Sequence, residues 1–204
     1  MMSEFEQRSK EWYADRLGKA TASRMSDVLA AASSERRKSY MMQLIAERLS
    51  GVSAEDFYVS KEMQRGIDLE DMARAVFALD KGLEVREAGF FTDTHIEWLG
   101  ASPDGLTSDG GLVEIKCPKT STHLSYCLER KCPSKYYAQV QCQLAVTGLA
   151  HAYFVSYDDR VPERLQMFCV HVPRDEPYIK EMRARVMQFL DEAQDIINSL
   201  GEGF

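Results

Sequence analysis

The sequence has no run of eighteen or more apolar residues, so no helix is expected to span a membrane. Residues 1–6 are net acidic and lack the basic-then-apolar order of a signal peptide, which predicts a cytoplasmic protein. The five cysteines are odd in number and form no Cys-x-x-Cys pair, so free thiols in a reducing compartment are expected. No repeat and no Pro/Gly-rich linker interrupts the 204 residues.

Basic charge is also scarce, because 25 Lys and Arg face 32 Asp and Glu and leave a net charge of −7. A protein that coats nucleic acid normally presents a basic face, so this balance argues against a coating protein. It does not exclude a nuclease. Carboxylates are needed to hold metal ions, and a few local basic groups are enough to guide a strand.

The spacing of apolar residues predicts helices in the first third, strands in the middle, and then a helix, two paired strands and a last helix. Helices are expected over residues 12–17, 24–31, 38–50, 66–79 and 134–147, and strands over 83–92, 95–101, 112–116, 151–157 and 165–172. The last helix, 175–199, has the clearest apolar stripe and begins at the cap Asp175. Residues 33–38 are polar and basic and are expected to form a loop.

This order of elements predicts an α/β fold in which a mixed central sheet is flanked by helices. We expect one domain over residues 1–204, long enough to bury a continuous core. It would consist of a helical part (1–80), a sheet core that carries the catalytic groups (81–173) and the C-terminal helix (175–199).

A carboxylate and a charged pair lie close together in the middle of the chain. Asp104 follows a predicted strand in the turn sequence Ser102-Pro103-Asp104-Gly105, where proline presets the backbone and glycine permits a positive φ. Glu114 and Lys116 are two residues apart on the next predicted strand, so both point to one face. Two carboxylates and one ammonium are therefore offered to one place.

Hard oxygen ligands in this number suit Mg²⁺ or Mn²⁺, which keep several waters and bind substrate phosphates. A lysine beside such an ion can position or deprotonate an attacking water. The alternative is an Asp-Gly turn and a surface Glu/Lys pair on a solvated strand, which the spacing alone does not exclude.

Two helices supply further candidates. Glu70 lies at the margin of the buried face of helix 66–79 and needs a cation nearby, which is either a metal ion or Arg74 one turn later. Gln139 and Gln143 are four residues apart on helix 134–147, where such amides either serve a site or only form hydrogen bonds at the edge of the core.

Four segments, taken in order, resemble a known family. They are Gly66-x-x-x-Glu70, Ser102-Pro103-Asp104-Gly105, Glu114-x-Lys116-Cys117-Pro118 and Tyr137-Ala138-Gln139-Val140-Gln141. Together they resemble the phage lambda exonuclease (YqaJ-like viral recombinase) branch of the PD-(D/E)XK nuclease superfamily. Arg16-Leu17-Gly18, Thr21-Ala22-Ser23 and Tyr157-Asp158 extend the resemblance over nearly the whole chain.

The resemblance implies a restriction-endonuclease-like core and a processive exonuclease that degrades one strand of linear double-stranded DNA from its 5′ end to mononucleotides. It implies a ring-shaped homotrimer around the DNA and two divalent ions, Mg²⁺ or Mn²⁺, in each active site. It also implies a phage or prophage protein in a bacterial host, with a single-strand annealing protein as the partner that uses the 3′ overhang.

The resemblance also implies roles for individual residues. Asp104 and Glu114 would be metal ligands, helped by the carbonyl of Ile115. Glu70 would hold the second ion or a water. Lys116 would orient or activate the nucleophilic water, and Gln139 would support that water and Lys116.

Contacts with the DNA end are implied in the same way. Arg16, Ser23 and Ser102 would hold the terminal 5′ phosphate, as suits a guanidinium with hydroxyl donors, although helix-end capping is the alternative for Arg16 and Ser23. Met63 would be an apolar wedge at the terminal base pair, unless it is a buried anchor. Arg36 or Arg37 would reach into the minor groove, unless both belong to a solvated basic loop.

The chain departs from the family in two places: it is short before Trp12, and residues 119–133 have no close match. Cys117, His123, Cys127 and Cys132 lie in or beside the second stretch, but their spacing fits neither a common zinc pattern nor a ferredoxin-like run. We expect packed or exposed thiols there. A structure- or site-specific endonuclease and a catalytically inactive DNA-end-binding module are the alternative functions.

Overall fold

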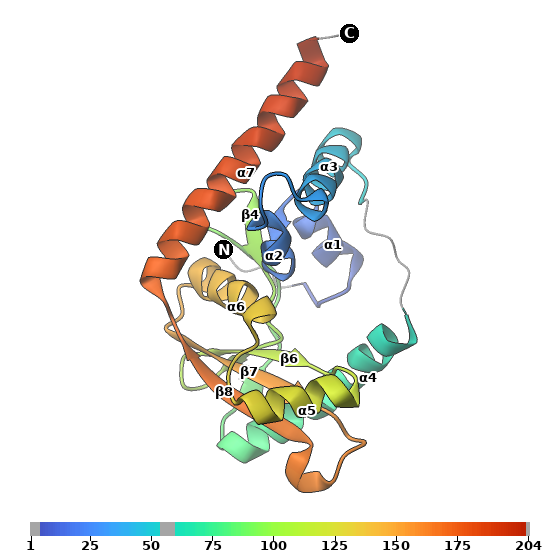
Figure 1. Ribbon diagram of the computed structural model, residues 1–204, viewed down its shortest axis with the longest axis vertical. Helices are drawn as coiled ribbons and strands as arrows, with labels where there is room; N and C mark the ends of the chain where they lie inside the picture. The colour runs from blue at the N-terminus through green and yellow to red at the C-terminus, as the bar shows by residue number, and fades with distance from the viewer. Residues whose placement is uncertain (1–4, 54–59, 203–204) are drawn as a thin grey trace.

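The computed structural model describes residues 5–53 and 60–202 (Figure 1). Its helices are α1 (Lys10–Arg16), η1 (Ala22–Arg24), α2 (Met25–Val28), α3 (Glu35–Ser50), α4 (Lys61–Lys81), α5 (Thr120–Glu129), α6 (Ser134–Thr147), η2 (Glu163–Leu165) and α7 (Glu176–Glu202), where η marks a 3-10 helix. Its strands are β1 (Ala20–Thr21), β2 (Val85–Arg86), β3 (Phe91–Thr92), β4 (Leu99–Ala101), β5 (Gly105–Thr107), β6 (Leu112–Lys116), β7 (His151–Tyr157) and β8 (Met167–Pro173). The α/β fold class is confirmed.

The strands form two mixed sheets. The larger has the order β2-β5-β6-β7-β8, with β6 and β7 parallel and the other neighbours antiparallel. The smaller has the order β1-β4-β3, with β1 parallel to β4 and β3 antiparallel to it. A parallel pair requires a crossover connection, and α5 and α6 form the one between β6 and β7. The short connection from β4 to β5 joins the two sheets, and Asp104 lies on it.

The two faces of β6 are covered by different helices. Val113 and Ile115 pack in one cluster with Phe77 of α4. Leu112 belongs to the other cluster, which is built around α6. Since side chains alternate along a strand, Glu114 points to the same face as Leu112. The polar partners that a facing helix offers to Glu114 must therefore come from α6.

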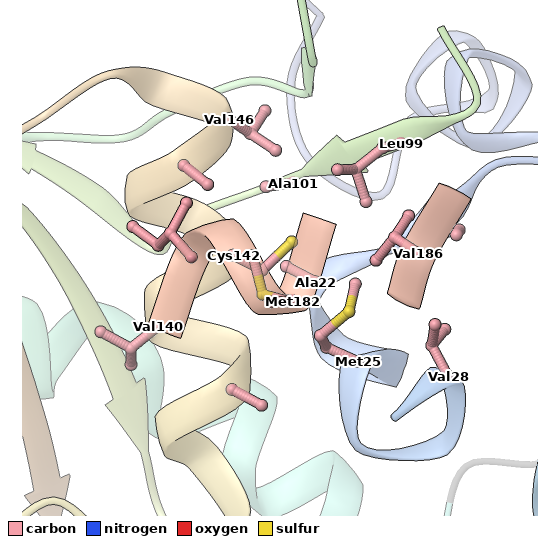
Figure 2. Packing of buried hydrophobic residues seen from close by; sticks show 14 of the residues in the cluster. Ala22, Met25, Val28, Leu99, Ala101, Val140, Cys142, Val146, Met182 and Val186 are labelled. Atoms are coloured by element: carbon pink, nitrogen blue, oxygen red, sulfur yellow. The ribbon is translucent and has the colours of Figure 1, made fainter. Parts of the chain in front are cut away.

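α6 is the centre of the main core. Figure 2 shows Cys142 of α6 gathered with Met182 of α7 and Met25 of α2, and all three are buried. Burial of each such side chain contributes about 1.5–3 kcal/mol to stability, which holds α6 firmly between α7, α2 and the sheet.

Most expected elements are confirmed. The helix over 38–50 ends at Gly51 and that over 134–147 ends at Gly148, both with the left-handed φ that favours glycine as a cap. Asp175 caps α7 by accepting a hydrogen bond from the Tyr178 amide at 3.1 Å. β7 and β8 pair antiparallel over their whole length. Among the helices of the described ranges, none combines the length and apolar content that a membrane crossing requires.

Several boundaries differ from expectation. The single strand expected over 83–92 is two strands, β2 and β3, because the chain crosses from the larger sheet to the smaller one there. The strand expected over 95–101 is only β4, and the helix expected over 24–31 ends at Val28. α4 begins five residues earlier than expected, at Lys61, and the expected loop at 33–38 is wrong because α3 begins at Glu35.

The elements that were not predicted include β5 and α5, besides β1 and the two 3-10 helices. β5 is short and completes a hairpin with β6. The segment of α5, Thr-Ser-Thr-His-Leu-Ser-Tyr-Cys-Leu-Glu, is rich in residues of modest helix propensity. Its buried His123 and Tyr126 show that tertiary packing stabilises this helix.

Candidate active site

Asp104 is held against the strand that carries Glu114. Its amide donates to the Val113 carbonyl at 3.1 Å, and its Oδ2 accepts from the Ile115 amide at 2.6 Å. Gly105, next in the chain, does not have the expected positive φ. Glycine is required there by close approach, since a Cβ would lie 2.6 Å from Cγ1 of Val85. The turn thus packs closely against the sheet, and this packing holds the Asp104 carboxylate beside β6.

Glu114 is only 1% exposed and receives three donors. Lys116 Nζ and Gln139 Nε2 both contact Oε1, the amide at 2.6 Å. Gln143 Nε2 donates to Oε2 at 2.5 Å. The structure therefore brings Glu114, Lys116 and Gln139 together as expected and adds Gln143, one helical turn beyond Gln139.

The buried charges influence one another. Burial, together with the nearby carboxylate of Glu114, raises the pKa of Asp104 well above its ordinary value. Burial alone would lower the pKa of Lys116, but the carboxylates of Glu114 and Asp104 outweigh it and raise that pKa above its ordinary value. Lys116 is therefore a cation at neutral pH, suited to orienting a water and stabilising negative charge.

Glu70 lies on α4, across from the Asp104 turn, and each of its carboxylate oxygens contacts an arginine. Oε1 contacts Arg74 at 3.0 Å, the ion pair that the sequence offered as an alternative, and Oε2 contacts Arg8 at 2.6 Å. Arg74 also donates from Nε to the Asp104 carbonyl at 3.0 Å. Arg74 thus links Glu70 to the Asp104 turn, so the three predicted carboxylates share one region.

A cleft of about 400 Å³ opens beside these groups, between α4 and the start of α5. Glu70, Ile115 and Lys116 line it. Met63 lines it too, is 58% exposed, and lies in the first turn of α4, so the buried-anchor alternative for this residue is wrong. Its position is compatible with the expected wedge.

The residues expected to bind the 5′ phosphate lie at one edge of the smaller sheet. Because β1 and β4 are parallel, Ser23 and Ser102, which follow them, lie at the same edge. Arg16 stacks over Trp12 at 4.1 Å from its guanidinium carbon to the ring centroid, and Trp12 Nε1 donates to Ser102 Oγ at 3.0 Å. Ser23 is exposed and its hydroxyl lies 3.2 Å from that of Thr21. A phosphate pocket from these three remains a prediction.

Arg36 and Arg37 differ sharply in exposure. Both lie in the first turn of α3 rather than in a loop, and neighbouring residues of a helix point in different directions. Arg37 is buried, pairs with Glu192 of α7 at 2.8 Å and lies over Phe189. Arg36 has a side chain 60% exposed, 4.0 Å from Asp27. Of the two, only Arg36 presents its guanidinium to solvent in this structure.

The side chains of the cysteine-rich stretch, residues 117–133, do not converge into a group of three potential metal ligands. All five cysteines are free, as expected. His123 is fully buried, with its ring nitrogens 2.8 Å from Ser156 Oγ and 2.7 Å from the Leu165 carbonyl. It is therefore a core histidine with both polar atoms satisfied.

Across residues 5–53 and 60–202, no three Asp, Glu, His or Cys side chains converge as they would in an all-protein metal cage. Mg²⁺ does not need such a cage, since one or two carboxylates with waters and substrate phosphates usually bind it. Asp104 and Glu114 provide these hard oxygen donors. The pair fits a divalent cation, whereas Glu70 can join it only after an arginine contact opens.

Sequence reasoning missed two contacts of the site. Gln143 was noted without a role, although an amide four residues from Gln139 on the same face was the available signal. Arg8 carries no signal in the sequence, because its partner Glu70 is 62 residues away. Only the path of the chain brings them together.

Comparisons with known proteins identify the family of this chain. A family model described as the YqaJ-like viral recombinase domain matches residues 11–150. The structure of LHK-Exo, an alkaline exonuclease from Laribacter hongkongensis, superimposes with a TM-score of 0.89 and 42% identity, covering 95% of this chain and 97% of that one. A second structure of LHK-Exo, in complex with dAMP, gives a TM-score of 0.90.

Two more distant proteins are also similar. A phage-related exonuclease from Haemophilus somnus 129PT shares the fold, with a TM-score of 0.73, 16% identity, and coverage of 89% of this chain and 96% of that one. Uncharacterized protein R354 of Acanthamoeba polyphaga mimivirus is 29% identical over 165 residues, which are 74% of this chain and 29% of that protein's length. The family match and the LHK-Exo likeness support a nuclease. The chain belongs to the YqaJ-like viral recombinase family.

Proposed function

We propose that this protein is a metal-dependent exonuclease that degrades one strand of linear double-stranded DNA from the 5′ end to mononucleotides and leaves a 3′ overhang. The observation that supports it most is the buried Glu114, held by Lys116 and Gln139 beside Asp104 at an open cleft. This arrangement occurs in a chain 42% identical to an alkaline exonuclease over nearly its full length. The dAMP bound to that relative is a mononucleotide, the kind of product this activity would release.

The chemistry follows from the geometry of the chain's own groups. Asp104, Glu114 and the Ile115 carbonyl would hold one Mg²⁺ or Mn²⁺, and Glu70 would help to hold a second. When bound, such ions lower the pKa of a water and neutralise charge on the phosphoryl oxygens. Lys116 would orient that water and stabilise the developing charge. Because it is already a cation, it is a poor base in this state. Gln139 keeps Glu114 Oε1 in place.

The same proposal assigns the DNA end to neighbouring residues. Arg16, Ser23 and Ser102 would bind the terminal 5′ phosphate, which would fix the distance from the end to the scissile bond. Met63, exposed at the cleft, would separate the last base pair. Arg36, rather than the buried Arg37, would reach the minor groove.

We also propose the assembly and setting that the family resemblance implies. These are a ring-shaped homotrimer around the duplex, a single-strand annealing protein as partner, and a role in phage-type recombination within the bacterial cytoplasm. A ring would place basic groups in its channel while the total charge stays at −7.

Three DNA substrates test the proposal. The protein is incubated with Mg²⁺ and 5′-phosphorylated linear, 5′-hydroxyl linear or covalently closed circular duplex, with Asp104→Ala as the control for contaminating nucleases. We expect mononucleotides from linear duplex, fastest from phosphorylated ends, and none from circles. Rapid nicking or linearisation of circles would favour the endonuclease alternative. Binding to ends without any release of nucleotides would favour the inactive module.

A further inference from the structure

The chain just before α1 crosses the rim of the active site and is fastened on both sides of Arg8. Gln7 Nε2 donates to the Ala88 carbonyl at 2.7 Å and to the Pro103 carbonyl, next to Asp104, at 2.9 Å. Ser9 caps α1, because its hydroxyl accepts from the Trp12 amide at 3.1 Å. Arg8 therefore occupies a fixed place at this rim.

The backbone of Arg8 is strained. Its φ is 69°, in the left-handed region that favours glycine, and in the described part of the chain Arg130 is the other non-glycine residue there. Such conformations persist only where the surrounding structure holds them, and they cluster at functional sites. Here the hydrogen bonds of Gln7 and Ser9 hold the backbone of Arg8 in this conformation, and this conformation sets the direction of the Arg8 side chain.

That side chain reaches the wall of the cleft. Arg8 Nη2 contacts Glu70 Oε2 at 2.6 Å, and Glu70 lines the cleft together with Lys116. The Arg8 side chain remains 43% exposed, whereas those of Glu70 and Arg74 are 16% and 13% exposed. The guanidinium thus contacts a residue that lines the cleft and keeps much of its own surface open to solvent.

Stability does not explain this arginine. Arg74, more buried and on the same helix, already compensates the charge of Glu70. An ion pair with a partner as exposed as Arg8 adds little stability, and the strained backbone of Arg8 lowers the stability further. Binding of a ligand explains a second guanidinium beside Glu70, held by a strained backbone, better than the stability of the fold does.

We propose that Arg8 is a substrate-binding residue that takes a phosphate group of the DNA strand in the cleft, an inference that rests on the proposed function. In the described structure only Nη2 of its guanidinium has a hydrogen-bond partner, so the other donors are available for phosphate oxygens. The contact with Glu70 keeps the guanidinium at the cleft. It also supplies a cation to Glu70 until a metal ion takes that carboxylate.

The test compares Arg8→Gly with Arg130→Gly. Both changes remove one positive charge and relieve the same backbone strain, but Arg130 follows α5 at the end far from Lys119, about 15 Å away along the helix. Binding of a 5′-phosphorylated duplex is measured in Ca²⁺, without relying on cleavage, over a range of salt concentrations, and the Tm of each variant is recorded.

We expect Arg8→Gly to bind duplex about tenfold more weakly and to lower the salt-dependence slope by about one, with Tm unchanged or raised. Arg8→Lys should restore part of the affinity, because a point charge replaces the fork of donors. Arg130→Gly should bind like the unmodified protein.

Two results would overturn the inference: Arg8→Gly binds duplex as tightly as the unmodified protein, or both glycine variants lose affinity equally. If the unmodified protein still degrades linear duplex in Mg²⁺, the proposed function stands in either case. If the unmodified protein neither binds nor degrades linear duplex, the proposed function fails and the role of Arg8 fails with it.

Discussion

Gln143→Leu tests whether the second glutamine of α6 holds Glu114 in its working position. Gln143 is fully buried, and its Nε2 donates to Glu114 Oε2 at 2.5 Å. A hydrogen bond to a charged group contributes about 1.5–3 kcal/mol, which the substitution removes. Part of this loss is offset, because Gln143 Oε1 is buried without a hydrogen-bond partner in the described structure, and its removal returns about 1 kcal/mol.

The expected net loss for Gln143→Leu is therefore about 1 kcal/mol, or roughly 3 °C in Tm for a chain of this size. Thermal unfolding followed by circular dichroism measures it. The kcat on linear duplex should fall about tenfold with little change in KM, because a misplaced carboxylate affects chemistry more than DNA binding. Gln139→Leu is the matched control for Tm: its side chain is partly exposed, so water replaces the lost donor and Tm changes less.

A Tm equal to or above that of the unmodified protein, together with unchanged kcat, would show that Gln143 does not hold Glu114. A fall in Tm with unchanged kcat would also refute the positioning role, because it would reduce Gln143 to a core residue.

Three further outcomes are expected. Asp104→Ala should abolish nucleotide release in Mg²⁺ while duplex binding in Ca²⁺ stays largely intact, and retained cleavage would remove Asp104 from the catalytic centre. Arg37→Ala should destabilise the protein by about 1–2 kcal/mol in urea titrations, because it removes a buried guanidinium and its half-buried ion pair, whereas Arg36→Ala should cost less than about 0.5 kcal/mol; equal losses would contradict the structure. Burial acts to raise the pKa of Asp109, but hydrogen bonds from neighbouring hydroxyls outweigh it and lower that pKa to about 2. The stability that ionised Asp109 contributes is therefore present above about pH 4 and lost as the pH falls towards 2. After allowance for solvent screening this amounts to about 1 kcal/mol, and an Asp109→Asn variant whose stability relative to the unmodified protein does not change between pH 5 and 2 would contradict it.

Local patterns predicted much of the fold. The apolar stripe of α7 and the glycine caps of α3 and α6 depend on residues close together in sequence, so these elements were predicted correctly. Residues 83–92 were not, because their division between two sheets depends on pairing with β4 and β5, strands that come later in the chain. α5 was missed because packing, rather than propensity, stabilises it.

The sequence by itself determined the chemical identity of the site. Alternation along one strand put Glu114 and Lys116 on one face, and the turn at Asp104 placed a carboxylate at a strand end. Only the tertiary structure decided what those groups contact, since hydrogen bonds and ion pairs depend on distances across the fold. Packing of α6 on the sheet gave Glu114 its two glutamines, packing of α7 on α3 took Arg37 out of solvent, and the path of the chain before α1 brought Arg8 to Glu70.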